Sequence, residues 1–167
     1  MFSAACPEAF PKSIVNVTVA EFSAPVPPFV TRRVDAYCAW QTVLDLFAEK
    51  GWKCRYSEEE VVRPVPQAEA VLSRPGDAEC PALRVWPTAD VLAIFRFRAG
   101  KEIDFDVDLR ELQGPKRLDV FCGFLRAIGR RLGRPVLMDP EGSYDRPVLG
   151  FDVEANRVIV LEDPQLR

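Results

Sequence analysis

Two runs of alternating apolar and polar residues, separated by three residues that include a glycine, constrain the fold of this chain more than any other feature. Val91–Phe97 and Lys101–Leu109 both alternate with a period of two, and Gly100 lies near their junction. Successive side chains of a β-strand point to opposite faces, so each run predicts a strand with one buried and one polar face. The short separation predicts that the two strands form an antiparallel hairpin.

The alternation also limits how the two strands pair. Paired positions must sum to an even number, because an odd sum would place phenylalanine opposite aspartate on one face. A three-residue loop ending at Gly100 gives glycine the position where a left-handed backbone is favoured. That loop predicts Phe95 opposite Ile103 and Arg96 opposite Glu102, and both pairings are favourable.

Two segments have the 3.6-residue period of an amphipathic helix. The first covers about 31–50, with an apolar face containing Val34, Tyr37, Cys38, Leu44, Phe47 and Ala48. The second begins at Pro115 and ends before Gly133, which are residues suited to a helix start and a C-terminal cap. Its apolar stripe comprises Leu118, Phe121, Cys122, Leu125, Ile128 and Leu132.

Further short strands are expected at 14–19, 52–56, 135–138, 148–151 and 157–161. The segment 57–81 is rich in proline and charge and is expected to be irregular, apart from a short helix near 67–73. Strands and helices in this order predict an α+β fold, a mainly antiparallel β-sheet with two long amphipathic helices packed on one face. We expect residues 1–167 to form a single α+β domain.

The composition restricts the chemistry that the chain can perform. The chain has no histidine, the commonest general base and zinc ligand, and its five cysteines include no C-x-x-C pair. No G-x-S-x-G elbow, phosphate-binding loop or dinucleotide fingerprint is present. We therefore expect no catalytic residues, metal or cofactor, and a protein that is not an enzyme. The net charge of −3 argues against nucleic acid as a partner.

The sequence predicts a cytoplasmic protein without a membrane-bound part. The first ten residues lack the basic and apolar regions of a secretory signal, and no apolar run approaches the ~20 residues of a membrane span. An odd number of cysteines without an export signal is typical of reduced thiols. Cys38 and Cys122 are expected to be small core residues.

Three aspartates on the polar side of the hairpin are the clearest candidates for functional residues. The spacing of the three aspartates, Asp104, Asp106 and Asp108, matches the start of a calcium-binding loop. That loop also needs glycine at its sixth position and glutamate at its twelfth, where this chain has Leu109 and Pro115. Three interpretations stay open: a solvated strand face, an acidic surface that binds a protein, and a metal site. The third would belong to a metal- or nucleotide-dependent enzyme or a small-ligand-binding protein that uses this stripe.

Two further polar groups have both a structural and a functional interpretation. The segment from Glu141 to Asp145, which contains Tyr144, is a turn and a candidate binding loop. Arginines at 126, 130, 131 and 134 gather toward one helix end, where they complement the helix dipole or clamp a phosphate.

The C-terminal half of the chain resembles a known class of binding proteins. The resemblance rests on VLAIFRFRAGKEIDFDVDL, on LDVFCGFLRAIGRRLGRPVLMDPEG and on PVLGFDVEANRVIVL. An acidic strand, an amphipathic helix ending in LGRPV, a PEG turn and a closing strand pair are similar to patterns in the small cytoplasmic immunity proteins of bacterial polymorphic toxin and type VI effector systems. The resemblance implies a stoichiometric inhibitor that binds a cognate toxin domain and blocks its active site.

These observations together predict a protein-binding surface. A partner's basic cleft would be steered by carboxylates, and a buried aromatic would supply affinity. The expected contact residues are Asp104, Asp106, Asp108, Glu141, Tyr144 and Asp145.

Overall fold

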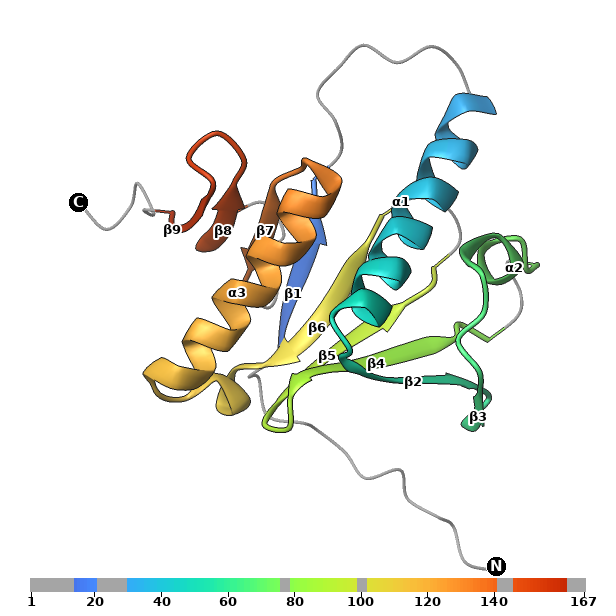
Figure 1. The fold of residues 1–167 in the computed structure, drawn as a ribbon, viewed down its shortest axis with the longest axis horizontal. Helices are drawn as coiled ribbons and strands as arrows, with labels where there is room; N and C mark the ends of the chain where they lie inside the picture. Colours follow the sequence, from blue (N-terminus) through green and yellow to red (C-terminus); the bar gives the residue numbers. More distant parts are fainter. Residues whose placement is uncertain (1–13, 21–29, 76–78, 99–101, 141–145, 162–167) are drawn as a thin grey trace, which may run out of the picture.

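The protein is a two-layer α+β structure built on one wide antiparallel sheet (Figure 1). A computed structural model describes residues 14–20, 30–75, 79–98, 102–140 and 146–161, and the side chains of 30–35 lie outside that description. Within the described residues the sheet has nine strands in the order β3-β2-β4-β5-β6-β1-β7-β8-β9. The strands are β1 Ile14–Val19, β2 Lys53–Glu58, β3 Val61–Arg63, β4 Ala82–Thr88, β5 Val91–Arg96, β6 Asp104–Asp108, β7 Val136–Asp139, β8 Leu149–Asp152 and β9 Arg157–Val160.

Two long helices lie on the same face of this sheet, as Figure 1 shows. They are α1 (Val30–Glu49) and α3 (Pro115–Leu132), and a short helix α2 (Ala68–Leu72) packs against α1. A 3₁₀ turn, η1 (Leu109–Leu112), connects β6 to the start of α3. The expected α+β fold with two long helices on one face is therefore confirmed, and so is the short helix expected near 67–73.

The alternating strands separate an apolar face from a polar one. In β1 the side chains of Val15, Val17 and Val19 are buried, while Asn16 and Thr18 on the opposite face are only partly buried. The buried face of the sheet meets the helices in an aromatic cluster, in which the ring centroids of Phe95 and Phe105 lie 4.6 Å apart. Burial of these rings on one side explains why the polar residues of each strand gather on the other side.

The expected hairpin of β5 and β6 forms, but its register differs from the expected one by two residues. Phe95 pairs with Phe105 rather than Ile103, and Ile94 pairs with Asp106. A shift of two residues leaves every side chain on the face predicted for it, so the alternation could not distinguish the two registers. The stacked phenylalanine pair favours the observed one. The expected loop glycine, Gly100, lies outside the described residues.

Two strands were not predicted from the sequence: β4 (Ala82–Thr88), which occupies the sheet between β2 and β5, and the short β3 (Val61–Arg63), which lies in the segment 57–81 that was expected to be irregular. Leu83 and Val85 are buried and alternate with the partly buried Arg84, which is the pattern of a half-buried strand. The pairing with β5 shifts register between Val85 and Thr88, and a proline is tolerated at such an irregularity.

Both long helices are rotated slightly from their expected orientation. In α3 Phe124 is buried and Leu118 is 44% exposed, whereas the expected stripe included Leu118 and omitted Phe124. In α1 Trp40 and Val43 are buried, and Cys38 is exposed instead of being a core residue. Cys122 is partly buried, and Gly133 caps α3 in the left-handed conformation as expected.

Candidate functional site

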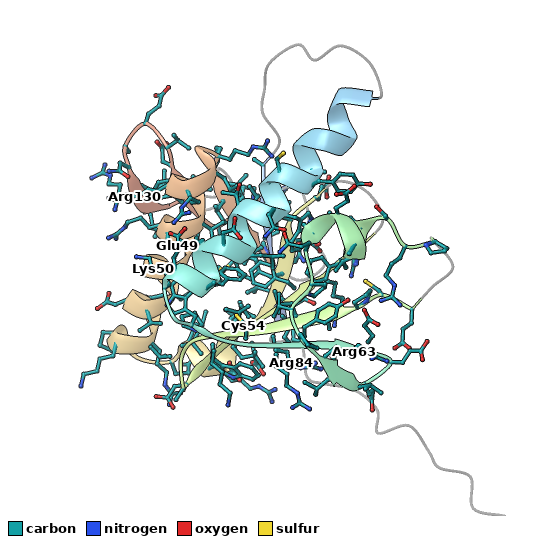
Figure 2. The ribbon with its side chains drawn as sticks, turned by 45° about the vertical axis from the view of Figure 1, so that its right-hand side comes forward. Glu49, Lys50, Cys54, Arg63, Arg84 and Arg130 are labelled. Atoms are coloured by element: carbon teal, nitrogen blue, oxygen red, sulfur yellow. The ribbon has the colours of Figure 1, made fainter. Side chains whose placement is uncertain are left out.

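The candidate site is the polar face of the sheet, which we call the open face because no described helix packs on it (Figure 1). Its residues are the partly buried or polar positions that alternate with the core, from β2 through β8. Figure 2 shows Cys54 of β2 on the helix side of the sheet and Arg84 of the neighbouring β4 on the other side. This face presents side chains from a rigid scaffold, which is the arrangement that a recognition surface requires.

One row of cross-strand neighbours crosses the open face and changes charge along its length. Starting at β2, directly paired residues place two arginines at one end, an isoleucine in the middle, and acidic and amide side chains at the other end. The row reads Arg55, Arg84, Ile94, Asp106, Asn16 and Asp139. The open face therefore has a basic end at β2 and β4 and an acidic end at β6, β1 and β7.

The three aspartates expected at the site do lie together on the open face, each on β6. Asp106 accepts a hydrogen bond from Arg96 at 2.5 Å and another from the Asn16 amide at 3.2 Å. Asp104 accepts from the same Asn16 amide at 3.4 Å and lies 3.9 Å from the Arg98 guanidinium. Strand β1 thus holds two of the three carboxylates in place through one asparagine.

Asp108 has a different, structural role. Its carboxylate accepts from the backbone N–H of Arg110 at 2.9 Å and caps η1, and it also forms an ion pair with the Arg110 guanidinium at 2.5 Å. Capping of this kind stabilises the turn that leads into α3. Asp108 consequently directs its carboxylate to Arg110, while Asp104 and Asp106 share Asn16.

A groove lies at the acidic end of the open face, with a cavity volume of about 690 Å³. Four carboxylates and one arginine supply its charged lining: Glu102, Asp104, Asp106, Asp139 and Arg98. The excess of carboxylates makes the groove attractive to a cation. Asn16, Thr18 and Asp139 of this lining were not expected at the site; their place opposite β6 follows from the pairing of β1 with both β6 and β7.

Burial changes the acidity of one groove residue. The pKa of Asp104 is raised, mainly because burial disfavours its charged form, and the hydrogen bond from Asn16 and the charge of Arg98 partly oppose that effect. A positive group entering the groove would favour the ionised form of Asp104. Binding of a cationic partner would therefore lower the pKa of Asp104 toward its usual range.

Other residues singled out from the sequence do not join this site. Glu141, Tyr144 and Asp145 lie outside the described residues. The arginines of α3 are engaged separately, since Arg130 donates to the Asn156 side chain at 2.6 Å and Arg131 pairs with Glu49 at the end of α1. Figure 2 shows Arg130 and Glu49 on the helix side of the molecule.

Two features of the described residues bear on other kinds of function. No group of three or more cysteine, aspartate or glutamate side chains in the described part of the chain is arranged to hold a metal ion. None of the described helices is both long enough and apolar enough to cross a membrane.

Comparison with known proteins adds no identity: the chain matches no protein-family model, no curated protein and no solved structure.

Proposed function

We propose that this protein is an immunity-type inhibitor, which neutralises a cognate bacterial toxin in the cytoplasm by binding it one-to-one. The observation that carries the proposal is the acidic groove at the β6-β1-β7 end of the open face. The toxin component rests on the resemblance of the C-terminal half to immunity proteins of polymorphic toxin and type VI effector systems.

The chemistry of the groove supports a basic protein partner. Enzymes that cut nucleic acids, and others with anionic substrates, carry basic clefts, and a groove with four carboxylates complements such a cleft. Two of the four carboxylates are fixed before binding, because Asn16 and Arg96 hold Asp106 and Asn16 also holds Asp104. Side chains that are already ordered lose little conformational entropy when a partner binds.

The proposed contact surface differs from the one expected from the sequence, of which Glu141, Tyr144 and Asp145 lie outside the described residues. Asp104 and Asp106 remain its centre, and Glu102 and Asp139 are added because they line the same groove. Asp108 lies at the border and contributes through its charge rather than through a free carboxylate, since it caps η1. A stable complex of this kind buries roughly 800 Å² on each partner.

The experiment that tests the function begins with the gene next to this one, which the proposal expects to encode a toxin; a neighbouring gene that encodes none would count against the proposal. The toxin domain is purified, mixed with this protein, and examined by size-exclusion chromatography with light scattering and by its own activity assay. The proposal expects a 1:1 complex and complete inhibition at one molar equivalent. An unrelated toxin domain is the control and should stay active. A neighbouring toxin that stays fully active with this protein in excess would overturn the proposal.

A further inference from the structure

A second hollow lies at the basic end of the open face, between β2, β4 and the end of β5. Its cavity volume is about 430 Å³, which falls within the ~300–1,000 Å³ typical of small-molecule sites. Its charged lining consists of three arginines and three glutamates: Arg55, Arg84, Arg96, Glu59, Glu60 and Glu79. The hollow and the acidic groove share Arg96 and Asp106 as a boundary, because these two residues form an ion pair.

Two of the arginines lie side by side, and no described carboxylate lies close enough to neutralise their positive charge. Arg55 and Arg84 are directly paired across β2 and β4, and like charges at such positions repel. Among the described residues, neither guanidinium has a carboxylate within 4.0 Å. The pair therefore concentrates positive charge at the hollow, and a bound anion would reduce the repulsion between the two guanidiniums.

A buried hydroxyl lies beside this pair. Ser57 is only 7% exposed, lines the hollow, and its Oγ accepts a hydrogen bond from the Arg84 guanidinium at 3.3 Å. The hydroxyl hydrogen of Ser57 has no acceptor among the described residues, although buried polar groups usually have one. Two guanidiniums and one hydroxyl donor together supply the hydrogen bonds that an oxyanion accepts.

The glutamates of the hollow extend this pattern. Glu59, Glu60 and Glu79 line the same space, yet within the described residues none forms an ion pair with the arginines or with any other group. Their carboxylates therefore lie more than 4.0 Å from the guanidiniums of the hollow. A ligand that carries both a negative and a positive group can pair with the arginines and with the glutamates. A simple anion would be repelled by the carboxylates.

We propose that this hollow is a binding site for a small zwitterion. Its oxyanion, a phosphate or a carboxylate, is held by Arg55, Arg84 and the Ser57 hydroxyl, and its cationic group lies against the glutamates. The site is separate from the acidic groove, and the proposal does not depend on the identity of any toxin partner.

Nuclear magnetic resonance titrations of the full chain at low ionic strength test the proposal with two matched pairs of probes. O-phosphoethanolamine is compared with ethyl phosphate, and β-alanine with propionate, so that each pair differs in the ammonium group. The proposal expects at least one zwitterion to bind saturably below about 10 mM and at least about threefold more tightly than its partner. The tighter zwitterion identifies the oxyanion as phosphate or carboxylate. Failure of both zwitterions to saturate, or equal binding within both pairs, would overturn the proposal.

Substitutions then locate the binding. Arg55→Gln, at an exposed position, and Ser57→Ala should each weaken binding of the better zwitterion by at least about fivefold. Arg157→Gln on β9 makes the same charge change at the far edge of the sheet and should leave the affinity within about twofold. Urea unfolding checks that each variant folds. Unchanged affinity in folded Arg55→Gln protein would contradict the assignment.

Discussion

The close packing of α3 against the sheet predicts opposite effects for two glycine substitutions in one helix. A Cβ atom added to Gly129 would lie 2.1 Å from a ring carbon of Phe151 on β8, and two more ring carbons would lie within 3.0 Å. Phe151 is only 1% exposed, so its ring has no room to move away. A Cβ added to Gly123, on the exposed side of the same helix, would meet nothing within 4 Å.

The expected magnitudes follow from these distances. Carbon atoms pack best at about 3.5–4.0 Å, so Gly129→Ala must distort the interface between α3 and β8. Overpacking of this kind costs about 1–3 kcal/mol, and 2.1 Å places the cost at the upper end. Replacing glycine within a helix returns about 1 kcal/mol of helix propensity. The net change in the free energy of unfolding is therefore a loss of about 2 kcal/mol for Gly129→Ala and a gain of about 0.5–1 kcal/mol for Gly123→Ala.

Urea unfolding followed by circular dichroism measures both changes. With a denaturant slope of about 2 kcal/mol per molar urea, the midpoint of Gly129→Ala should fall by about 1 M, while that of Gly123→Ala should rise slightly. The two variants share the added methyl group and the helix, so packing alone separates them. A Gly129→Ala midpoint equal to or above that of the wild type would refute the packing of α3 described above.

Two further predictions concern buried ionisable groups. Burial raises the pKa of Asp104, so the contribution of this residue to stability is complete below its unfolded pKa and is lost as the pH rises through the folded pKa. The stability of Asp104→Asn relative to the wild type should therefore increase across that pH range. A difference in urea midpoints that stays constant with pH would contradict this prediction. Burial and, to a smaller extent, the hydrogen bond to Glu58 raise the pKa of Tyr56 to about 12. The free energy of unfolding of the wild type should therefore fall between about pH 10 and about pH 12, and that of Tyr56→Phe should fall less. Urea unfolding at each pH measures the difference.

The fold could be predicted from the sequence wherever one physical signal acted alone. The period of two in 91–109 gave the faces of β5 and β6, and Pro115 with Gly133 gave the bounds of α3. The register of β5 and β6 could not be obtained, because a slip of two residues preserves both faces and only tertiary packing of Phe95 on Phe105 separates the alternatives. Strand β4 was not predicted, because its alternation is clear only over Leu83–Val85 and Pro87 interrupts it, so the local signal is short.

The shared face of the two central aspartates of the candidate site could be predicted from the sequence, but the residues that contact them could not. The alternation placed Asp104 and Asp106 on one polar face, as the structure has them. Their neighbour Asn16 lies 88 and 90 residues away in the chain, so its contacts depend on strand order, which a single sequence does not specify. The capping role of Asp108 depends on the turn at η1, which the strand pattern gave no reason to expect.

The central claim, that the acidic groove is the surface that meets the toxin, is tested most directly by association rates. Glu102→Lys, at the exposed edge of the groove, and Asp45→Lys, on the exposed side of α1, make the same charge change on opposite faces of the molecule. Stopped-flow association with the neighbouring toxin domain should be slowed at least about tenfold by Glu102→Lys at low salt, less at high salt, and within about twofold by Asp45→Lys. Equal rates for the two variants, or a larger effect of Asp45→Lys, would contradict the claim.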